Sequence, residues 1–386
     1  MRILLVSQMT PYLPSHDGVR TLAAHLVQHL ARRHTVAVIA GAGRGETPEQ
    51  RRWAASRCLW VETLSGGPGI QPGKGAPAEG LRDAVARAVY RFMPHVLHLE
   101  GGVLAPLARV GGVPTVLGAH DSGALRAREL RRFCRAPWSW LAARLAERRA
   151  AAWEARWFAA ADARIVLSEE DGAALGRLGT DAEVIPFGID LHHHEFRRAG
   201  QSGRIVFTGN LSWPPNVDAA RRFARVILPR VRARHPRAEF VVAGADPAPG
   251  VRALAALPGV LVTAAVPDLR PSIWGAAIAV SPLRAGFGTK NRVLEAMALG
   301  TPVVASPRSL SGLAEVVAGQ HVLAAASDDA MAEAVLTLLG DPALADRLAH
   351  EARALVEAAY GWPAIIRRYE ALLGRVAGTV PAERAA

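Results

Sequence analysis

The sequence predicts an α/β protein made of two doubly wound halves, each a parallel sheet with helices on both faces. Short runs of β-branched and other apolar residues recur along the chain, and helix-like segments separate them. Several runs are continuously apolar rather than alternating, which is typical of parallel strands covered on both faces. The pattern restarts near residue 204, and the 386 residues suffice for two to three domains. Strands that alternate with helices in this way indicate right-handed βαβ units.

The expected strands fall into two groups. Before the restart we expect strands at residues 2–8, 34–41, 59–64, 95–100, 114–120, 164–168 and 183–187. After it we expect strands at residues 204–210, 239–245, 260–266, 278–284, 302–306 and 321–326. The segment between the groups is polar and rich in turn residues, so it reads as a connection between domains. Residues 65–80 are rich in glycine and proline and are expected to form a loop.

Composition limits the possible functions. The formal net charge is +12, which favours anionic partners such as phosphorylated small molecules, anionic lipid or nucleic acid. A basic nucleic-acid-binding protein is therefore one alternative, but no zinc pattern, aromatic RNP motif or helix-turn-helix stands out, and we expect no nucleic acid. Cys58 and Cys134 are too few for a disulfide framework. With no secretory signal and no apolar run near ~18 residues, we expect a cytoplasmic protein.

The stretch RAGFGTKNRVLEAMALGTPVVAS, residues 284–306, has the pattern of an anion site. A strand ends at Arg284, a glycine-containing loop follows, and a helix is expected from about Asn291 to Leu299, stopped by Gly300. The free N–H groups and the dipole of a helix N-terminus favour an anion, and ligands of open α/β sheets bind at the carboxyl ends of strands.

Two side chains of this helix suggest what the anion carries. Arg292 would add charge, and the carboxylate of Glu295 could accept two hydrogen bonds from a sugar diol. A diphosphate joined to a ribose fits this order. The same spacing also fits an ordinary strand–helix connection with a solvated Arg292–Glu295 pair.

Several segments together resemble the retaining GT-B glycosyltransferases of the family 4 type. PLRAGFGTKNRVLEAMALGTPVVAS (282–306) resembles the donor-site signature of that family. Four more segments resemble its first βαβ unit, the two sides of its domain boundary and its final helix: RILLVSQMTPYLPSHDGVRTLAAHLVQHLARRHTVAVIA (2–40), VIPFGID (184–190), IVFTGNLSWPPNVDA (205–219) and YGWPAIIRRYEALL (360–373). HDS (120–122), TGNLSWPPN (208–216) and the donor-site signature further resemble a bacterial subgroup associated with exopolysaccharide and surface-glycan assembly.

The resemblance implies a GT-B fold, in which two Rossmann-like domains face a cleft and the C-terminal helix returns to the first domain. The acceptor-side domain would span 1–190 and about 363–386, the linker 191–202, and the nucleotide-sugar domain 203–362. The co-substrate would be a nucleotide diphosphate sugar, with no tightly bound cofactor and no metal. The acceptor would be a glycan or a lipid-linked molecule.

Residue roles follow from the same resemblance. Glu295 would hold the nucleotide ribose, and Arg292 would meet the diphosphate together with backbone N–H groups of 288–291. His120, with Asp121 beside it, would lie near the transferred sugar, although Asp121 could instead cap the next helix. The donor-side residues are Gly209, Asn210, Arg284, Gly286, Gly288, Thr289, Lys290, Asn291, Arg292 and Glu295.

The sequence departs from the family pattern at two places. Phe287 stands where many relatives carry a glutamate that contacts the donor sugar. Gly209 is followed by Asn210 where many carry an arginine, and no lysine follows nearby. The missing positive charge would come from Arg284 and Lys290.

The family's mechanism keeps the anomeric configuration, and the departing phosphate oxygen takes the acceptor proton. One alternative is an inverting enzyme in which His16 is the general base, oriented by Asp17, in the acceptor-side loop around Gly18. A second alternative is a GT-B epimerase acting on the nucleotide sugar. The three consecutive histidines 192–194 point apart and are expected to be part of the linker.

Residues 125–158 hold nine arginines and four tryptophans. Arginine with tryptophan is typical of a helix at an anionic bilayer surface, although the tryptophans could equally face the core. This segment predicts peripheral contact with the inner face of the membrane, which would suit a lipid-linked acceptor.

Overall fold

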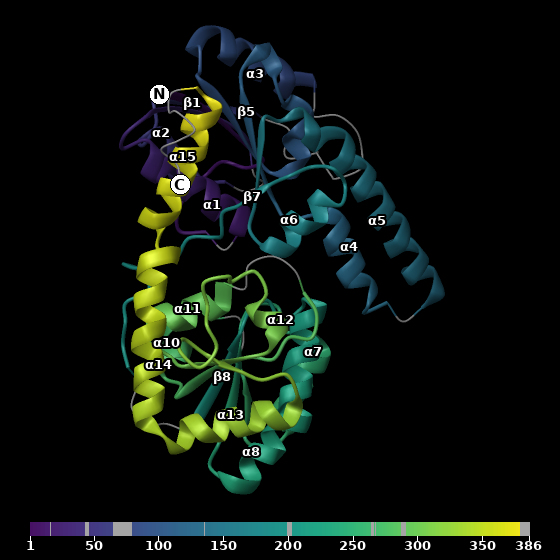
Figure 1. The fold of residues 1–386 in the computed structure, drawn as a ribbon, viewed down its shortest axis with the longest axis vertical. Coiled ribbons are helices and arrows are strands. Elements are labelled where there is room, and N and C mark those ends of the chain that lie inside the picture. The colour runs from purple at the N-terminus through teal and green to yellow at the C-terminus, as the bar shows by residue number, and fades with distance from the viewer. Residues whose placement is uncertain are drawn as a thin grey trace. The chain divides into compact units, whose positions relative to one another are not determined.

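The computed structural model describes residues 1–15, 17–42, 46–64, 79–134, 136–198, 203–263, 266, 268–286 and 291–378. The chain divides into two compact units (Figure 1). Unit 1 comprises residues 1–187 together with 362–386, and unit 2 comprises residues 188–361. Among the described helices, none is long and apolar enough to cross a membrane.

Unit 1 is built on a seven-stranded sheet in the order β3-β2-β1-β4-β5-β6-β7, with every pairing parallel. The strands are β1 (Arg2–Ser7), β2 (Thr35–Gly41), β3 (Trp60–Leu64), β4 (Val96–Glu100), β5 (Thr115–His120), β6 (Ala163–Val166) and β7 (Glu183–Val184). β1, β2, β4 and β5 are almost wholly buried, because helices cover both faces of the sheet. Their carboxyl ends form one edge.

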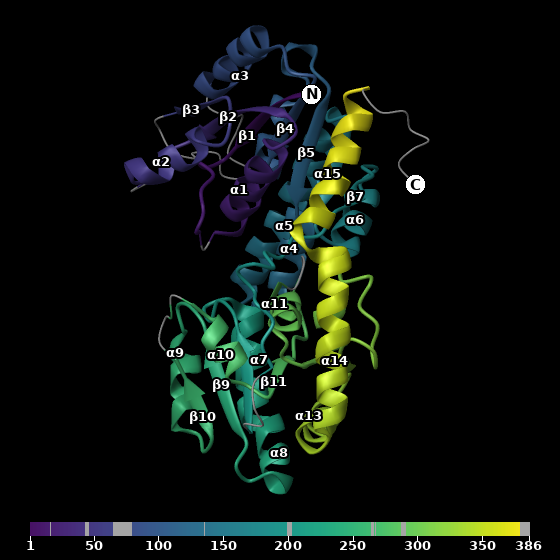
Figure 2. The same cartoon turned by 90° about the vertical axis from the view of Figure 1, so that its left-hand side faces the viewer.

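The helices of unit 1 lie on both faces of this sheet. They are α1 (Gly18–Leu30), α2 (Pro48–Ala55), α3 (Glu79–Phe92), α4 (Gly123–Arg131), α5 (Pro137–Trp157), α6 (Glu169–Gly176) and α15 (Trp362–Val376), with short turns η1 (Gly102–Leu107), η2 (Val110–Gly112) and η3 (Phe158–Ala160). α15, yellow in Figures 1 and 2, packs against α1 and β5, and its Ile365 shares a core with Leu26 of α1. The opposite face carries a second core, in which α3 packs.

Unit 2 repeats the plan with a six-stranded parallel sheet in the order β10-β9-β8-β11-β12-β13. The strands are β8 (Arg204–Thr208), β9 (Glu239–Ala243), β10 (Val260–Val262), β11 (Ile278–Ser281), β12 (Val303–Ala305) and β13 (Leu323–Ala324). The helices are α7 (Pro214–Arg222), α8 (Leu228–Arg234), α9 (Pro249–Arg252), α10 (Arg270–Trp274), α11 (Asn291–Leu299), α12 (Pro307–Leu310), α13 (Asp328–Gly340) and α14 (Pro342–Leu355), with turns η4 (Phe223–Ile227), η5 (Ala253–Ala256) and η6 (Val356–Tyr360).

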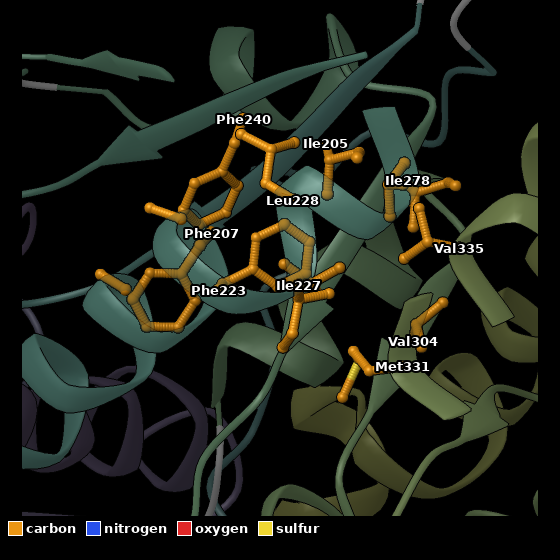
Figure 3. Packing of buried hydrophobic residues seen from close by; sticks show 14 of the residues in the cluster. Ile205, Phe207, Phe223, Ile227, Leu228, Phe240, Ile278, Val304, Met331 and Val335 are labelled. Carbon is orange, nitrogen blue, oxygen red and sulfur yellow. The ribbon is translucent and has the colours of Figure 1, made fainter. Parts of the chain in front are cut away.

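Two cores sandwich this second sheet. In one, Phe207 of β8 and Phe240 of β9 meet Phe223, whose ring centroid lies 4.3 Å from that of Phe240 (Figure 3). In the other, α11 and η6 pack on the opposite face. Burial of three phenylalanines at one point stabilises this unit by several kcal/mol, at roughly 1.5–3 kcal/mol for each fully buried ring. The core therefore holds β8 and β9 rigidly beneath their carboxyl-end loops.

The predicted fold class is confirmed. Each of the thirteen predicted strands is present among the described residues, but several end two to four residues earlier than predicted. β8 stops at Thr208 because Gly209 has φ 144°, and β11 stops at Ser281 because Pro282 cannot continue a ladder. Residues 188–198 pack on unit 2, where Ile189 N donates to Tyr360 O at 2.7 Å and Arg197 N donates to Leu299 O at 3.0 Å. The predicted loop at 65–80 lies mostly outside the described residues.

Candidate functional site

The carboxyl edge of the unit 2 sheet carries helix α11 where the sequence predicts it. Val293, Leu294, Met297 and Ala298 form its buried face, as the periodicity indicates. Gly300 ends the helix with φ 85°, a left-handed value that favours glycine. Of the loop before this helix, Phe287, Gly288, Thr289 and Lys290 lie outside the described residues.

The side chain of Arg292, in the first turn of α11, contacts two other residues of unit 2. Its Nη2 donates to Asn216 Oδ1 at 2.8 Å, and its guanidinium carbon lies 4.8 Å from the centroid of the Phe207 ring. Its Nη1 is fully buried and has no hydrogen-bond partner among the described residues. Burial lowers the pKa of Arg292 to about 10, although the charge of Glu295 partly offsets this. A buried donor without a partner is costly, so this guanidinium is suited to an added acceptor.

Asn216 is a site residue that the sequence analysis did not single out. It is buried on the first turn of α7, and its Nδ2 donates to Asn210 O at 2.7 Å. The amide thus joins the loop after β8 to Arg292. Its signal was available, because the motif TGNLSWPPN ends on this residue.

Gly209 makes room for this contact. A Cβ atom at residue 209 would lie 2.8 Å from Arg292 Nη2, and φ 144° also favours glycine there. Asn210 does not point its side chain at the guanidinium. Its Oδ1 accepts from Ser212 N at 2.9 Å and from Ser212 Oγ at 2.7 Å, which shapes the loop.

Three serines fix the loop that leads to α11. Ser309 Oγ lies 2.9 Å from Ser281 Oγ and 3.0 Å from Ser306 Oγ, and Ser306 Oγ donates to Leu283 O at 2.6 Å. Arg308 donates to the carbonyl of Gly286. These bonds position residues 283–286 at the end of β11, and sequence reasoning missed them because lone serines carry no pattern.

The other donor-side residues are placed as follows. Arg284 is exposed and forms a two-bond ion pair with Asp218 of α7, at 2.7 and 3.1 Å. Asp218 raises the pKa of Arg284. Glu295 is half-buried and lies three residues after Arg292 on α11. Gly286 has φ 136°.

Glu100, at the end of β4, lies at the carboxyl edge of the unit 1 sheet, where it bridges two histidines. Its Oε2 is 2.5 Å from His98 Nε2, and its Oε1 is hydrogen-bonded to Nε2 of His120, at the end of β5. His98 and Glu100 are fully buried and His120 is 8 % exposed. Gly118, on the neighbouring strand, leaves the space, because a Cβ there would lie 2.8 Å from Glu100 Oε2.

The charges in this cluster support one another. Burial alone would raise the pKa of Glu100, but the charge and hydrogen bonds of His120 and His98 lower it to about 2. Burial alone would lower the pKa of His120, but the Glu100 carboxylate outweighs it, so the pKa of His120 is raised. His120 is therefore favoured as an imidazolium, and its φ of 68° is a strained value for a residue other than glycine. Sequence analysis found His120 but missed Glu100.

The remaining acceptor-side residues have structural contacts. Asp17 caps α1, accepting from Arg20 N at 2.8 Å, and Gly18 begins that helix with open space around its Cα. Asp121 does not cap α4, because Ser122 does so, and its Oδ2 lies 3.7 Å from Arg126 Nη1. His16 lies outside the described residues.

A further polar cluster lies beside the ends of β1 and β2. Glu46, whose side chain is 2 % exposed, accepts from Thr10 Oγ1 at 2.8 Å and pairs with Arg20 at 3.3 Å. Arg20 Nη1 also donates to the Tyr12 hydroxyl at 2.8 Å. No spacing in the sequence predicts this cluster, because its members come from helix α1 and from the segments that follow β1 and β2.

The three consecutive histidines contact the loop around Asp190, whose Oδ1 accepts from His192 N at 3.0 Å and His193 N at 3.2 Å. Within the described ranges, no group of three or more His, Cys, Asp or Glu side chains is arranged to hold a metal ion.

Comparison with known proteins gives two family matches along the chain. The model described as Glycosyltransferase Family 4 matches residues 16–193, and that described as Glycosyl transferases group 1 matches residues 202–341. The first match contains the Glu100 cluster of unit 1, and the second contains Arg292 of unit 2. The chain belongs to the GT-B glycosyltransferases. A search of curated proteins found no match.

This glycosyltransferase shares its fold with several solved structures. Sucrose-phosphate synthase from Thermosynechococcus elongatus has a TM-score of 0.70 at 18% identity, covering 98% of this chain and 100% of that one. Anabaena HepE in complex with UDP-glucose has a TM-score of 0.66 at 16% identity, covering 98% and 100%. A glycosyltransferase from Rickettsia africae ESF-5 has a TM-score of 0.66 at 11% identity, covering 97% and 98%. At these identities the likeness establishes the fold alone.

Proposed function

We propose that this glycosyltransferase moves a sugar from a nucleotide diphosphate sugar to a hydroxyl acceptor with retention of the anomeric configuration. The observation that carries the proposal is the Arg292 guanidinium, buried at the start of α11 with Nη1 unpartnered among the described residues. A diphosphate oxygen would supply the missing acceptor. Its negative charge would also stabilise the protonated guanidinium, whose pKa burial lowers to about 10.

The donor would lie along the carboxyl edge of unit 2. The N-terminus of α11, Arg292 and Lys290 would stabilise the charge that develops on the leaving diphosphate. Glu295, one turn further along, would accept hydrogen bonds from the ribose hydroxyls. Arg284 contributes less to this charge because Asp218 already neutralises it. The base would contact loops after residues 244 and 266.

The HepE comparison supports a nucleotide donor. Its solved complexes contain UDP, UDP with glucose, and UDP-glucose. We extend the class of ligand, a nucleotide diphosphate sugar, to this chain and leave the base and sugar to experiment.

His120 would donate a hydrogen bond to the transferred sugar rather than act as a base. Glu100 is hydrogen-bonded to Nε2 of His120 and favours the charged form of the His120 ring. In that form Nδ1 of His120 also carries a proton, which it can donate. The departing phosphate oxygen would then take the acceptor proton. An inverting reaction would need His16 as base, and analysis of the anomeric configuration of the product distinguishes the two.

The acceptor is proposed to be a glycan or lipid-linked molecule in bacterial surface-glycan or exopolysaccharide synthesis, at the cytoplasmic face of the membrane. The resemblance of HDS (120–122) and TGNLSWPPN (208–216) to that subgroup supports this assignment.

The test is a thermal-shift screen of the full chain against UDP, GDP, ADP, TDP and their sugars, since a ligand of the folded state raises stability by mass action. A donor found in this way is then used with Glu295→Ala. We expect that variant to fold as the wild type does and to lose donor use by at least 100-fold. Near-normal turnover by Glu295→Ala would refute the ribose assignment, and a changed sugar in the absence of acceptor would indicate an epimerase.

A further inference from the structure

The second half of the α4–α5 hairpin presents a surface that the sugar-transfer chemistry does not use. α4 and α5 pack side by side and run away from the unit 1 sheet (Figure 1). The inward side of α5 is polar and paired: Glu154 is 2 % exposed and accepts from Ser122 Oγ at 3.0 Å, while Glu147 pairs with Arg131 at 2.5 Å. The acids of the hairpin are therefore turned toward its interior.

The outward side of α5 exposes large apolar side chains. Trp138 is 77 % exposed, Leu141 53 % and Leu145 44 %. Their spacing of three and four residues places them on one face of the helix. Soluble proteins tolerate single exposed apolar residues, but a contiguous row including a tryptophan indicates an interaction surface.

The same face continues as a basic row. Arg148, Arg149 and Arg156 follow Leu145 at helical spacing and are exposed. No ion pair joins these arginines to any other described residue, whereas the glutamates nearby are paired or buried. Between residues 123 and 157 the chain carries nine arginines and three glutamates. The face is thus apolar at one end, cationic at the other, and without acids of its own.

Trp140 lies beside the apolar row, and two arginine side chains lie near its ring. The guanidinium carbons of Arg131 and Arg144 lie 5.4 and 5.5 Å from the centroid of its ring. An aromatic ring with cations over it is suited to the boundary between acyl chains and headgroups, where the apolar ring and the charges each find a favourable environment.

We infer that the outward face of α5 (Trp138, Leu141, Leu145, Arg148, Arg149 and Arg156) docks on a lipid bilayer that contains anionic headgroups. The apolar row enters the interface, and the arginines contact headgroup phosphates. The arginines favour an anionic bilayer over a neutral one because their charges are complementary to the headgroups. The apolar row favours a bilayer over a nucleic acid, because a nucleic acid has no hydrocarbon interior to accept these side chains. The inference rests on the proposed function only for its purpose, namely access to a lipid-linked acceptor.

The test measures co-sedimentation of the full chain with phosphatidylcholine vesicles, with and without phosphatidylglycerol. We expect binding to the anionic vesicles, which high salt weakens. The triple variant Arg148→Gln, Arg149→Gln, Arg156→Gln is expected to bind about 100-fold more weakly, at about fivefold per arginine. The matched control is Arg51→Gln, Arg52→Gln, Arg91→Gln, which removes three exposed arginines elsewhere in unit 1 and should bind as the wild type does.

A second variant tests the apolar row. Trp138→Ser, Leu141→Ser, Leu145→Ser keeps every charge and is expected to lose at least tenfold in vesicle binding. Because these side chains are exposed, the nucleotide thermal shift should be unchanged in all variants. That separates failure of the docking surface from failure of the donor site.

Equal vesicle binding by the Arg148, Arg149 and Arg156 triple variant and by its control would overturn the inference. Equal binding of the wild type to neutral and anionic vesicles would also overturn it. A loss of affinity for duplex DNA, without loss of vesicle binding, in the arginine variant would reassign the face to nucleic acid. Competition by millimolar glycerol phosphate that releases the protein from vesicles would indicate a site for a free phosphate.

Discussion

The two sheets of this glycosyltransferase end in buried charges that are treated in opposite ways. In unit 1 the Glu100 carboxylate is buried, and both of its oxygens are hydrogen-bonded to histidine rings. In unit 2 the Arg292 guanidinium has one hydrogen bond to Asn216, and its Nη1 has no partner among the described residues. In unit 1 the buried carboxylate is paired within the protein, whereas in unit 2 one nitrogen of the buried guanidinium is left for a ligand.

In unit 1 the protein itself holds the charged group in place. In unit 2 the charged group keeps a donor available for a ligand, and we call this group receptive. A paired buried charge supports folding and fixes the orientation of its neighbours, here His120. A buried cation with an open N–H costs stability in the free protein and repays it when a ligand arrives. Unit 1 therefore positions a side chain, while unit 2 keeps binding energy for a substrate.

The largest expected effect comes from removing the receptive charge with Arg292→Met. We expect transfer activity to fall by about 100- to 1,000-fold, because a preorganised donor to the developing charge is lost. The stability of the free protein should change by no more than about 1 kcal/mol, since the cost of burying the cation disappears with it. Thermal unfolding with and without the nucleotide found in the screen measures both. A large loss of stability with an unchanged nucleotide shift would show that Arg292 is purely structural.

Breaking the paired charge with Glu100→Gln should act mainly on folding. The carboxylate supports His120 and His98 within a buried site, and a lowering of its pKa from about 4.5 to about 2 corresponds to a stabilisation on the order of 3 kcal/mol. Chemical denaturation of both proteins at pH 7 measures the loss. A loss below about 1 kcal/mol would mean that the histidines do not depend on Glu100.

The same variant has a defined pH dependence. Glu100 has a lowered pKa, so its stabilisation is present above its unfolded pKa near 4.5 and is lost as pH falls toward 2. His120 has a raised pKa, so its stabilisation is present below about 6.5 and is lost as pH rises through its folded pKa. Glu100→Gln should flatten the alkaline fall. A fall that persists unchanged in the variant would assign it to other groups.

The sequence predicted the parallel sheets and α11 because their signals are local. Continuous apolar runs mark buried strands, and Gly300 ends the helix that carries Arg292 and Glu295. It did not reveal that Glu100 joins His98 to His120, because two of these residues lie 20 positions apart and meet only when β4 and β5 pair. The motif TGNLSWPPN marked the segment that ends at Asn216, but not its hydrogen bond to Arg292, which lies 76 positions away. Side-chain networks across strands depend on register, and composition and spacing do not report register.

The smallest expected effect comes from loosening Arg292 without removing it. Asn216→Ala deletes the amide that joins Asn210 O to Arg292 Nη2. We expect donor affinity to fall by about tenfold, with stability lowered by about 1–2 kcal/mol because Nη2 of the buried Arg292 loses its acceptor. The measurement is nucleotide titration by calorimetry beside chemical denaturation. Arg284→Gln is the control, because Arg284 lies after β11 and its exposed pair with Asp218 of α7 should contribute less than about 1 kcal/mol. If the control weakens the nucleotide as much as Asn216→Ala does, general charge near α7 rather than a held Arg292 sets the affinity, and the receptive edge of unit 2 is less specific than its geometry indicates.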